Sequence, residues 1–106
     1  MDIHIDDEYL DSLLQGVQPK GKPKYQEAVV AKFKKTIKLL SHCSRVEALW
    51  QFKSLNFEAL EGDKKGLFSV RVDMQYRLEF SIDRFYEGEK LTKEVIRIQS
   101  MSNHYR

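Results

Sequence analysis

Hydrophobic residues recur every three or four positions in the first half of the chain, which is the spacing of amphipathic helices. The first such stretch begins after Asp6 or Asp7, either of which can cap a helix, and it ends near Gly16. Residues 18–24 hold both prolines and a glycine, so they predict a connection. A second helix is predicted from Tyr25, with an apolar stripe made of Val29, Val30, Phe33, Ile37 and Leu40.

A third, shorter helix is predicted after Ser44, which can cap it. Roughly helical spacing continues there until an irregular stretch at residues 54–63; the apolar positions are Val46, Leu49, Trp50 and Phe52.

From residue 66 the hydrophobic period changes to two, which is the mark of strands. The pattern predicts strands near residues 66–73, 76–82 and 95–99, with a tight antiparallel hairpin at residues 73–75. Helices followed by strands indicate an α+β architecture in which the helices pack on one face of a small antiparallel sheet. The opposite face is predicted to stay open. With 106 residues the chain fits one domain, residues 1–106.

The composition is typical of a globular protein, with 42% hydrophobic and 32% charged residues. No apolar run approaches the roughly 20 residues that span a bilayer, and the N-terminus lacks the basic start of a signal peptide. We therefore expect no membrane association and a cytoplasmic location. The one cysteine, Cys43, adjoins an apolar helical stretch and is predicted to be buried.

Charge is unevenly distributed although the net charge is only +2. Residues 1–18 carry five acids and no Lys or Arg, whereas residues 19–45 carry eight bases and the single acid Glu27. Such a basic block is either a footprint for nucleic acid or the solvated side of a helix. Charge alone leaves both interpretations open.

Strand alternation places several polar residues on the predicted open face: Ser69, Arg71, Arg77, Glu79, Arg97 and Gln99. A guanidinium keeps its charge at any accessible pH and binds phosphate oxygens through paired donors. The alternative is that these arginines pair across strands with Glu79 and Asp73. Alternation does not choose between these two interpretations.

Two further segments can border this face. Residues 62–66 form a basic turn before the first strand, and residues 104–106, with His104, follow shortly after the third strand. A histidine titrates near neutrality and can move a proton during RNA cleavage, although one so near a chain end is often a frayed surface residue. No zinc spacing, phosphate-binding glycine loop or serine-hydrolase elbow is present.

Residues 55–78 resemble the signature of HigB-type toxins in the RelE/ParE superfamily. That signature runs through Gly-Asp-x-x-Gly, an aromatic residue, Ser-Ile-Arg, and a Tyr-Arg pair that begins the next strand. The matching residues are Gly62, Asp63, Gly66, Phe68, Ser69, Arg71, Tyr76 and Arg77. The element order resembles that of the family over nearly the whole chain.

This resemblance implies a RelE-like fold and metal-free, cofactor-free cleavage of mRNA in the ribosomal A site. It also implies a helix-turn-helix antitoxin of the HigA type as partner. Arg71 and Arg77 would bind phosphate and His104 would transfer a proton. The remaining RNA-binding residues would be Lys64, Lys65, Asn56, Arg97 and Tyr105. The sequence departs from the family pattern at Ser102 and Asn103, where Asp and Tyr are expected, and at Asn56, where His is expected.

Two other functions remain open at this point. A ParE-like inhibitor of gyrase would bind through its helices and tail and perform no chemistry. A silent relative, which the three departures permit, would bind an antitoxin and have no activity alone.

Overall fold

The computed structural model describes residues 1–103. Most of the helical residues precede most of the strands, as the change of hydrophobic period predicts, and the fold is α+β. Within these residues five strands form one sheet in the order β1-β5-β4-β3-β2. The elements in chain order are β1 (Asp2–Ile5), α1 (Glu8–Gln15), α2 (Glu27–His42), the 3₁₀ helices η1 (Val46–Gln51) and η2 (Lys53–Leu55), β2 (Glu58–Ala59), the 3₁₀ helix η3 (Gly62–Lys64), β3 (Phe68–Arg71), β4 (Arg77–Glu87) and β5 (Lys90–Ser102).

Helix α1 confirms the first predicted helix and both of its ends. The Asp7 carboxylate accepts a hydrogen bond from the Leu10 amide at 2.9 Å, which satisfies a donor that the helix itself leaves unpaired. Gly16 ends the helix with a φ of 79°, a left-handed conformation that glycine adopts without strain.

Helix α2 begins at Glu27, two residues later than predicted, because Gln26 is in an extended conformation. Its buried positions follow the predicted stripe, except that Val30 is only half-buried. Tyr25 stays outside the helix, and its hydroxyl donates to the Met101 carbonyl at 3.0 Å. No helix within residues 1–103 is both long and apolar enough to cross a bilayer.

The predicted third helix is the short 3₁₀ helix η1. Three residues per turn place Val46 and Leu49 on the same side, and both are buried. Trp50 and Phe52, the other two apolar residues of this stretch, are exposed by 61% and 38%.

The three predicted strands and their hairpin are confirmed as β3, β4 and β5. The Asp73 carboxylate fixes the hairpin by accepting hydrogen bonds from the amides of Gln75 and Tyr76. Strands β1 and β2 were not predicted. Because β1 pairs in parallel with β5, the sheet is mixed, and the prediction of a purely antiparallel sheet was wrong.

Strand β5 contains a bulge at Gln99. Glu79 faces Ser100, whereas the next residue of β4, Phe80, faces Ile98, so Gln99 is the extra residue. Strict alternation placed Gln99 on the polar face in register with its neighbours. The bulge makes Ser100, and not Gln99, the residue opposite Glu79.

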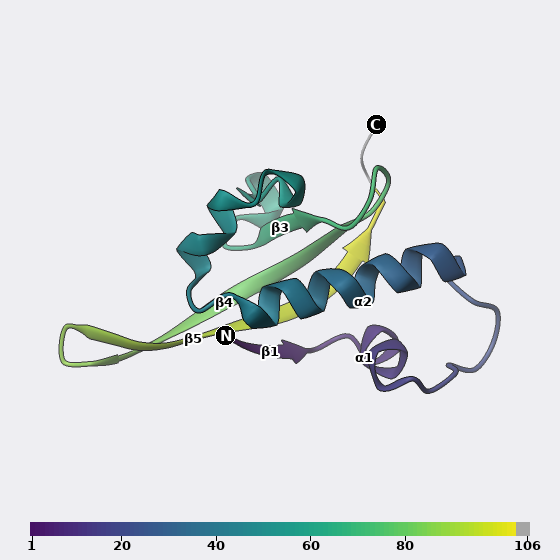
Figure 1. The fold of residues 1–106 in the computed structure, drawn as a ribbon, viewed down its shortest axis with the longest axis horizontal. Coiled ribbons are helices and arrows are strands. Elements are labelled where there is room, and N and C mark those ends of the chain that lie inside the picture. The colour runs from purple at the N-terminus through teal and green to yellow at the C-terminus, as the bar shows by residue number, and fades with distance from the viewer. Residues whose placement is uncertain (104–106) are drawn as a thin grey trace.

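The core lies between α2, η1 and one face of the sheet, and Figure 1 shows α2 lying across the strands. Its fully buried large side chains are Leu10, Phe33, Leu40, Leu49, Leu78, Phe80, Ile96 and Ile98. Burial of each such side chain contributes about 1.5–3 kcal/mol to folding. Cys43 is buried beside this core as predicted, and burial raises the pKa of its thiol.

Candidate functional site

The sheet face opposite the core carries polar residues from β3, β4 and the end of β5. Arg71 faces Arg77, which faces Ser102. One pleat further on, Ser69 faces Glu79. The sequence therefore predicted correctly which of these side chains share a face.

The predicted openness of this face was wrong. Ser69, Arg77 and Glu79 are exposed by only 0%, 4% and 3%. Side chains and backbone from residues 56–64 contact them, because this segment forms the edge strand β2 and the turn η3 beside β3. Sequence alternation cannot reveal these contacts, since they come from a segment without regular period.

Arg77 is held by several contacts. Its Nε donates to the Ser69 hydroxyl at 3.0 Å, and its Nη2 donates to the Asn56 carbonyl at 2.6 Å. The same nitrogen lies 3.6 Å from Oε1 of Glu58. A buried guanidinium needs such partners, because an uncompensated charge in the interior is costly.

Asn56 takes part in the site through its backbone. It is the one non-glycine residue with positive φ in the described chain, at 44°, a conformation that asparagine tolerates better than most residues. This conformation coincides with the hydrogen bond from Arg77 to its carbonyl. The residue is exposed, so its side chain can still meet a ligand as the sequence analysis expects.

Glu79 binds three groups from two other segments, η3 and β5. Both of its carboxylate oxygens accept from Lys64 Nζ, at 2.8 and 2.9 Å, and the hydroxyls of Ser102 and Ser100 donate at 3.0 and 3.4 Å. Burial acts to raise the pKa of Glu79, but the hydrogen bonds from Lys64 and the two serines, with the lysine charge, outweigh it. The net effect is a lowered pKa and an ionised carboxylate.

The Gly-Asp-x-x-Gly motif shapes the turn that brings Lys64 to this carboxylate. Gly62 and Gly66 have φ values of 65° and 98°, which strain any residue with a side chain. Between them the chain forms η3, so Lys64 turns toward Glu79 while Lys65 is exposed. Of the two predicted RNA-binding lysines, one is thus already paired and the other faces solvent.

Arg71 differs from Arg77 in that its side chain is exposed. Within residues 1–103 no ion pair joins it to a carboxylate. Arg77 already has the Glu58 carboxylate at 3.6 Å, whereas the exposed Arg71 can meet a bound anion.

Glu58 is a site residue that the sequence analysis missed. It lies in the two-residue strand β2, and its side chain is 46% exposed while reaching Arg77. The missed signal was its position two residues after Asn56, in a stretch that we had interpreted only as irregular. Its carboxylate is an acceptor group that solvent and a ligand can reach.

Arg97 lies away from these residues. It faces Ser81, four positions along β4 from Arg77, and it pairs with Asp83 and, at 3.8 Å, with Asp6. The hydrogen bond and charge of Asp83 raise the pKa of Arg97. Cross-strand pairing, the alternative weighed from the sequence, therefore describes Arg97, although its partner is Asp83.

His104 and Tyr105 lie outside the described residues. The chain reaches them from Ser102, the last residue of β5, which donates to Glu79. Within residues 1–103 no group of three or more His, Cys, Asp or Glu side chains is arranged to hold a metal ion.

The arrangement combines two cationic groups with an accessible carboxylate. Arg71 and Arg77 can stabilise negative charge, and Glu58 can accept a proton from a group bound beside them. Glu79, already paired with a lysine and buried, is placed to hold the turn and the end of β5 together.

The sequence matches no protein-family model and no curated protein. The structure resembles the YoeB/ParE toxin from Agrobacterium tumefaciens, with a TM-score of 0.55 and 15% identity over 99% of this chain and 100% of that one. It also resembles a mutant of YafQ from E. coli, with a TM-score of 0.57 and 18% identity, covering 97% of this chain and 92% of that one. A second YafQ structure from E. coli gives a TM-score of 0.54 at 16% identity with the same coverage.

Likenesses at this level of identity show the fold alone. They extend over nearly the whole chain and agree with the element order given above. The α+β fold of this protein is the RelE-like toxin fold.

Proposed function

We propose that this protein is the toxin of a type II toxin-antitoxin system and cleaves mRNA in the ribosomal A site. It is a single toxin domain of the HigB type, acts in the cytoplasm, and is neutralised by a helix-turn-helix antitoxin of the HigA type. The proposal joins the signature in residues 55–78 with a fold that resembles a YoeB/ParE toxin.

The observation that carries the proposal is the arrangement of Arg71, Arg77 and Glu58. Arg71 and Arg77 are register partners on neighbouring strands, and the half-exposed carboxylate of Glu58 lies 3.6 Å from Arg77 Nη2. RNA cleavage without a metal needs stabilisation of charge on phosphate and a base for the ribose hydroxyl. These three residues supply both.

In the proposed reaction Glu58 accepts the proton of the ribose 2′-OH, and the 2′-oxygen attacks the adjacent phosphorus. Arg71 and Arg77 stabilise the charge that gathers on the phosphate oxygens. His104 donates a proton to the departing 5′-oxygen as its bond to phosphorus breaks. The products are a 2′,3′-cyclic phosphate and a 5′-hydroxyl, so atoms and charges balance. The role of His104 rests on the sequence resemblance.

The proposed base also has a suitable environment. Glu58 lies 3.6 Å from the Arg77 guanidinium, and its exposure lets a bound nucleotide reach it. Glu79 is less suited to this role because its two oxygens are already engaged by Lys64, Ser100 and Ser102.

The test is to incubate purified protein with programmed ribosomes that carry an end-labelled message, and to map new 5′ ends. Variants Glu58→Gln, Arg71→Ala and His104→Ala are compared with the wild type. Glu61→Gln is the matched control, because Glu61 is exposed and neighbours the site without contacting Arg77.

Cleavage at A-site positions by the wild type and Glu61→Gln, lost in the three site variants, would support the proposal. Intact message in every lane would overturn it. A parallel supercoiling assay then separates the alternatives, since a gyrase inhibitor would block supercoiling and a silent relative would affect neither reaction.

A further inference from the structure

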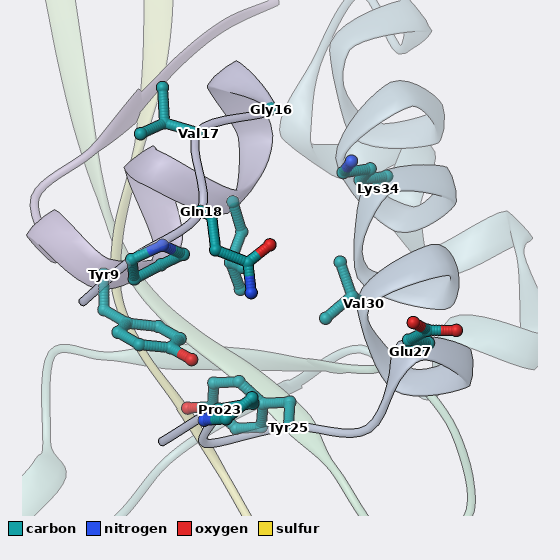
Figure 2. Close-up of a pocket in the computed structure, with 11 residues that line it drawn as sticks. Tyr9, Gly16, Val17, Gln18, Pro23, Tyr25, Glu27, Val30 and Lys34 are labelled. Carbon is teal, nitrogen blue, oxygen red and sulfur yellow. The ribbon is translucent and has the colours of Figure 1, made fainter. Parts of the chain in front are cut away.

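A groove lies between α1 and α2, on a different part of the molecule from the candidate site. Figure 2 shows it bounded by Tyr9 of α1, by Val17 and Pro23 of the connecting segment, and by Val30 of α2. Tyr25 lies at one end and Lys34 at the other. Apolar side chains therefore form much of a surface that solvent reaches.

The size of the groove limits what it can hold. Its volume is about 250 Å³, below the roughly 300–1,000 Å³ typical of small-molecule sites. Space of this order suits one large side chain. Single large side chains that enter fitted pockets are the usual anchors of protein–protein interfaces.

The two tyrosines have little polar capacity left for a nucleotide base. The Tyr9 hydroxyl accepts a hydrogen bond from the Lys24 amide at 2.8 Å, and the Tyr25 hydroxyl donates to the Met101 carbonyl at 3.0 Å. Recognition of an unpaired base needs free groups that pair with its edges. Both tyrosine hydroxyls are thus already engaged, and the other polar side chains that line the groove are Gln18, Glu27 and Lys34.

One side of the groove is strongly basic, whereas Glu27 lines the groove itself and α1 on the other side carries Glu8 and Asp11. Residues 20–38 contain seven lysines and one acid, Glu27, and all seven lysines are exposed. Within the described part of the chain none of them has a carboxylate partner. Lys24 lies over the Tyr9 ring at 4.7 Å from its centroid, at the edge of the groove. The unneutralised charge complements an acidic partner.

We propose that this groove binds an acidic segment of a partner protein, with one large apolar side chain in the groove and carboxylates over the surrounding lysines. The identification of that partner with the antitoxin rests on the proposed function. The chemistry of the segment follows from the groove and does not depend on RNA cleavage.

The test uses the full-length protein as immobilised target for a phage library of short random peptides. Selected sequences are synthesised with a fluorescent label, and their binding is measured by anisotropy at low and high salt. Val30→Phe fills the groove, and the triple variant Lys20→Glu, Lys22→Glu, Lys24→Glu reverses its charge. Lys53→Glu with Lys90→Glu is the control, because both lysines are exposed on other segments. Melting temperatures verify that each variant folds.

We expect selected peptides to combine several acids with a large apolar residue. Each groove variant should weaken their binding at least about tenfold, and the control should not. High salt should weaken binding as well. No enrichment, peptides without acids, or equal binding to both groove variants would each overturn the proposal.

A labelled single-stranded RNA provides the competing outcome. If the triple lysine variant loses RNA binding while no acidic peptide is selected, the basic surface binds nucleic acid and the proposal fails. Since neither assay measures cleavage, this result would leave the nuclease proposal standing, and loss of cleavage would leave the docking proposal standing.

Discussion

Lys64 Nζ lies within hydrogen-bonding distance of both carboxylate oxygens of the buried Glu79. The pair joins the turn of the Gly-Asp-x-x-Gly motif to the middle of the sheet. The same carboxylate accepts from Ser102, so one buried acid ties together three segments that border the candidate site. Glu79 is therefore a positioning residue, and its replacement should affect the turn and the end of β5 that it holds together.

Replacing Glu79 with Gln should lower the free energy of unfolding by about 1–2 kcal/mol near neutral pH, since Lys64 loses its charged acceptor. Because the folded protein lowers the pKa of Glu79, the stabilisation is complete above the ordinary value of 4.5 and is lost as pH falls through the lower folded value. Urea unfolding across this range should show the wild-type advantage shrinking in acid. A stability difference between wild type and Glu79→Gln that persists unchanged in strong acid would contradict the lowered pKa of Glu79. Glu61→Gln is the reference variant.

Arg71→Ala and Arg77→Ala should separate activity from stability. Arg71 is exposed, so its removal should leave unfolding unchanged while lowering cleavage by roughly 10²-fold. Arg77 is buried and bonded to Ser69 and Asn56, so its removal should also cost about 1–3 kcal/mol of stability. Thermal melting beside the cleavage assay distinguishes the two. Equal melting temperatures for both variants would show that the buried contacts of Arg77 contribute little.

Asn56→Gly should retain the stability of the protein, because glycine adopts a φ of 44° without strain and keeps the carbonyl that Arg77 uses. Asn56→Val should be destabilised, since a β-branched side chain resists this conformation. Comparing cleavage by the folded glycine variant with that of wild type then isolates the side chain. Unchanged cleavage would remove Asn56 from the predicted RNA-binding residues.

Cys43 should react slowly with thiol reagents in the native protein. Burial raises the pKa of its thiol, so little of the reactive thiolate is present near neutral pH. Labelling with an aromatic disulfide should proceed quickly only after unfolding in urea. Rapid labelling of the native protein would show that the region around the end of α2 opens readily.

Periodicity predicted the parts of the fold in which one face is buried. Phe33 and Leu40 on α2, and Leu78 and Phe80 on β4, lie in the core as their spacing indicates. Periodicity failed where burial comes from irregular segments. Residues 56–64 have no hydrophobic period, and yet they contact the buried Arg77.

Short elements were missed for a related reason. Strand β1 has only four residues, and its alternation of Ile3 and Ile5 with polar neighbours is too brief to stand out. Its parallel pairing with β5 brings together the two ends of the described chain, a relationship that no local pattern encodes. The site residue Glu58 was overlooked because its importance comes from the partner across space, Arg77.

The bulge at Gln99 decides whether odd or even residue numbers face the site. Upstream of it Arg97 lies on the polar face, and downstream Ser100 and Ser102 do. Deleting Gln99 alone would remove none of the residues that bond to Arg77 or Glu79. It would also leave the orientation of the end of β5 unchanged, because Ser100 would then follow Ile98 directly and still face Glu79, with Met101 in the core. The extra residue thereby accounts for the change from odd to even residue numbers on the site face without altering which side chains of β5 lie opposite Glu79 and Arg77.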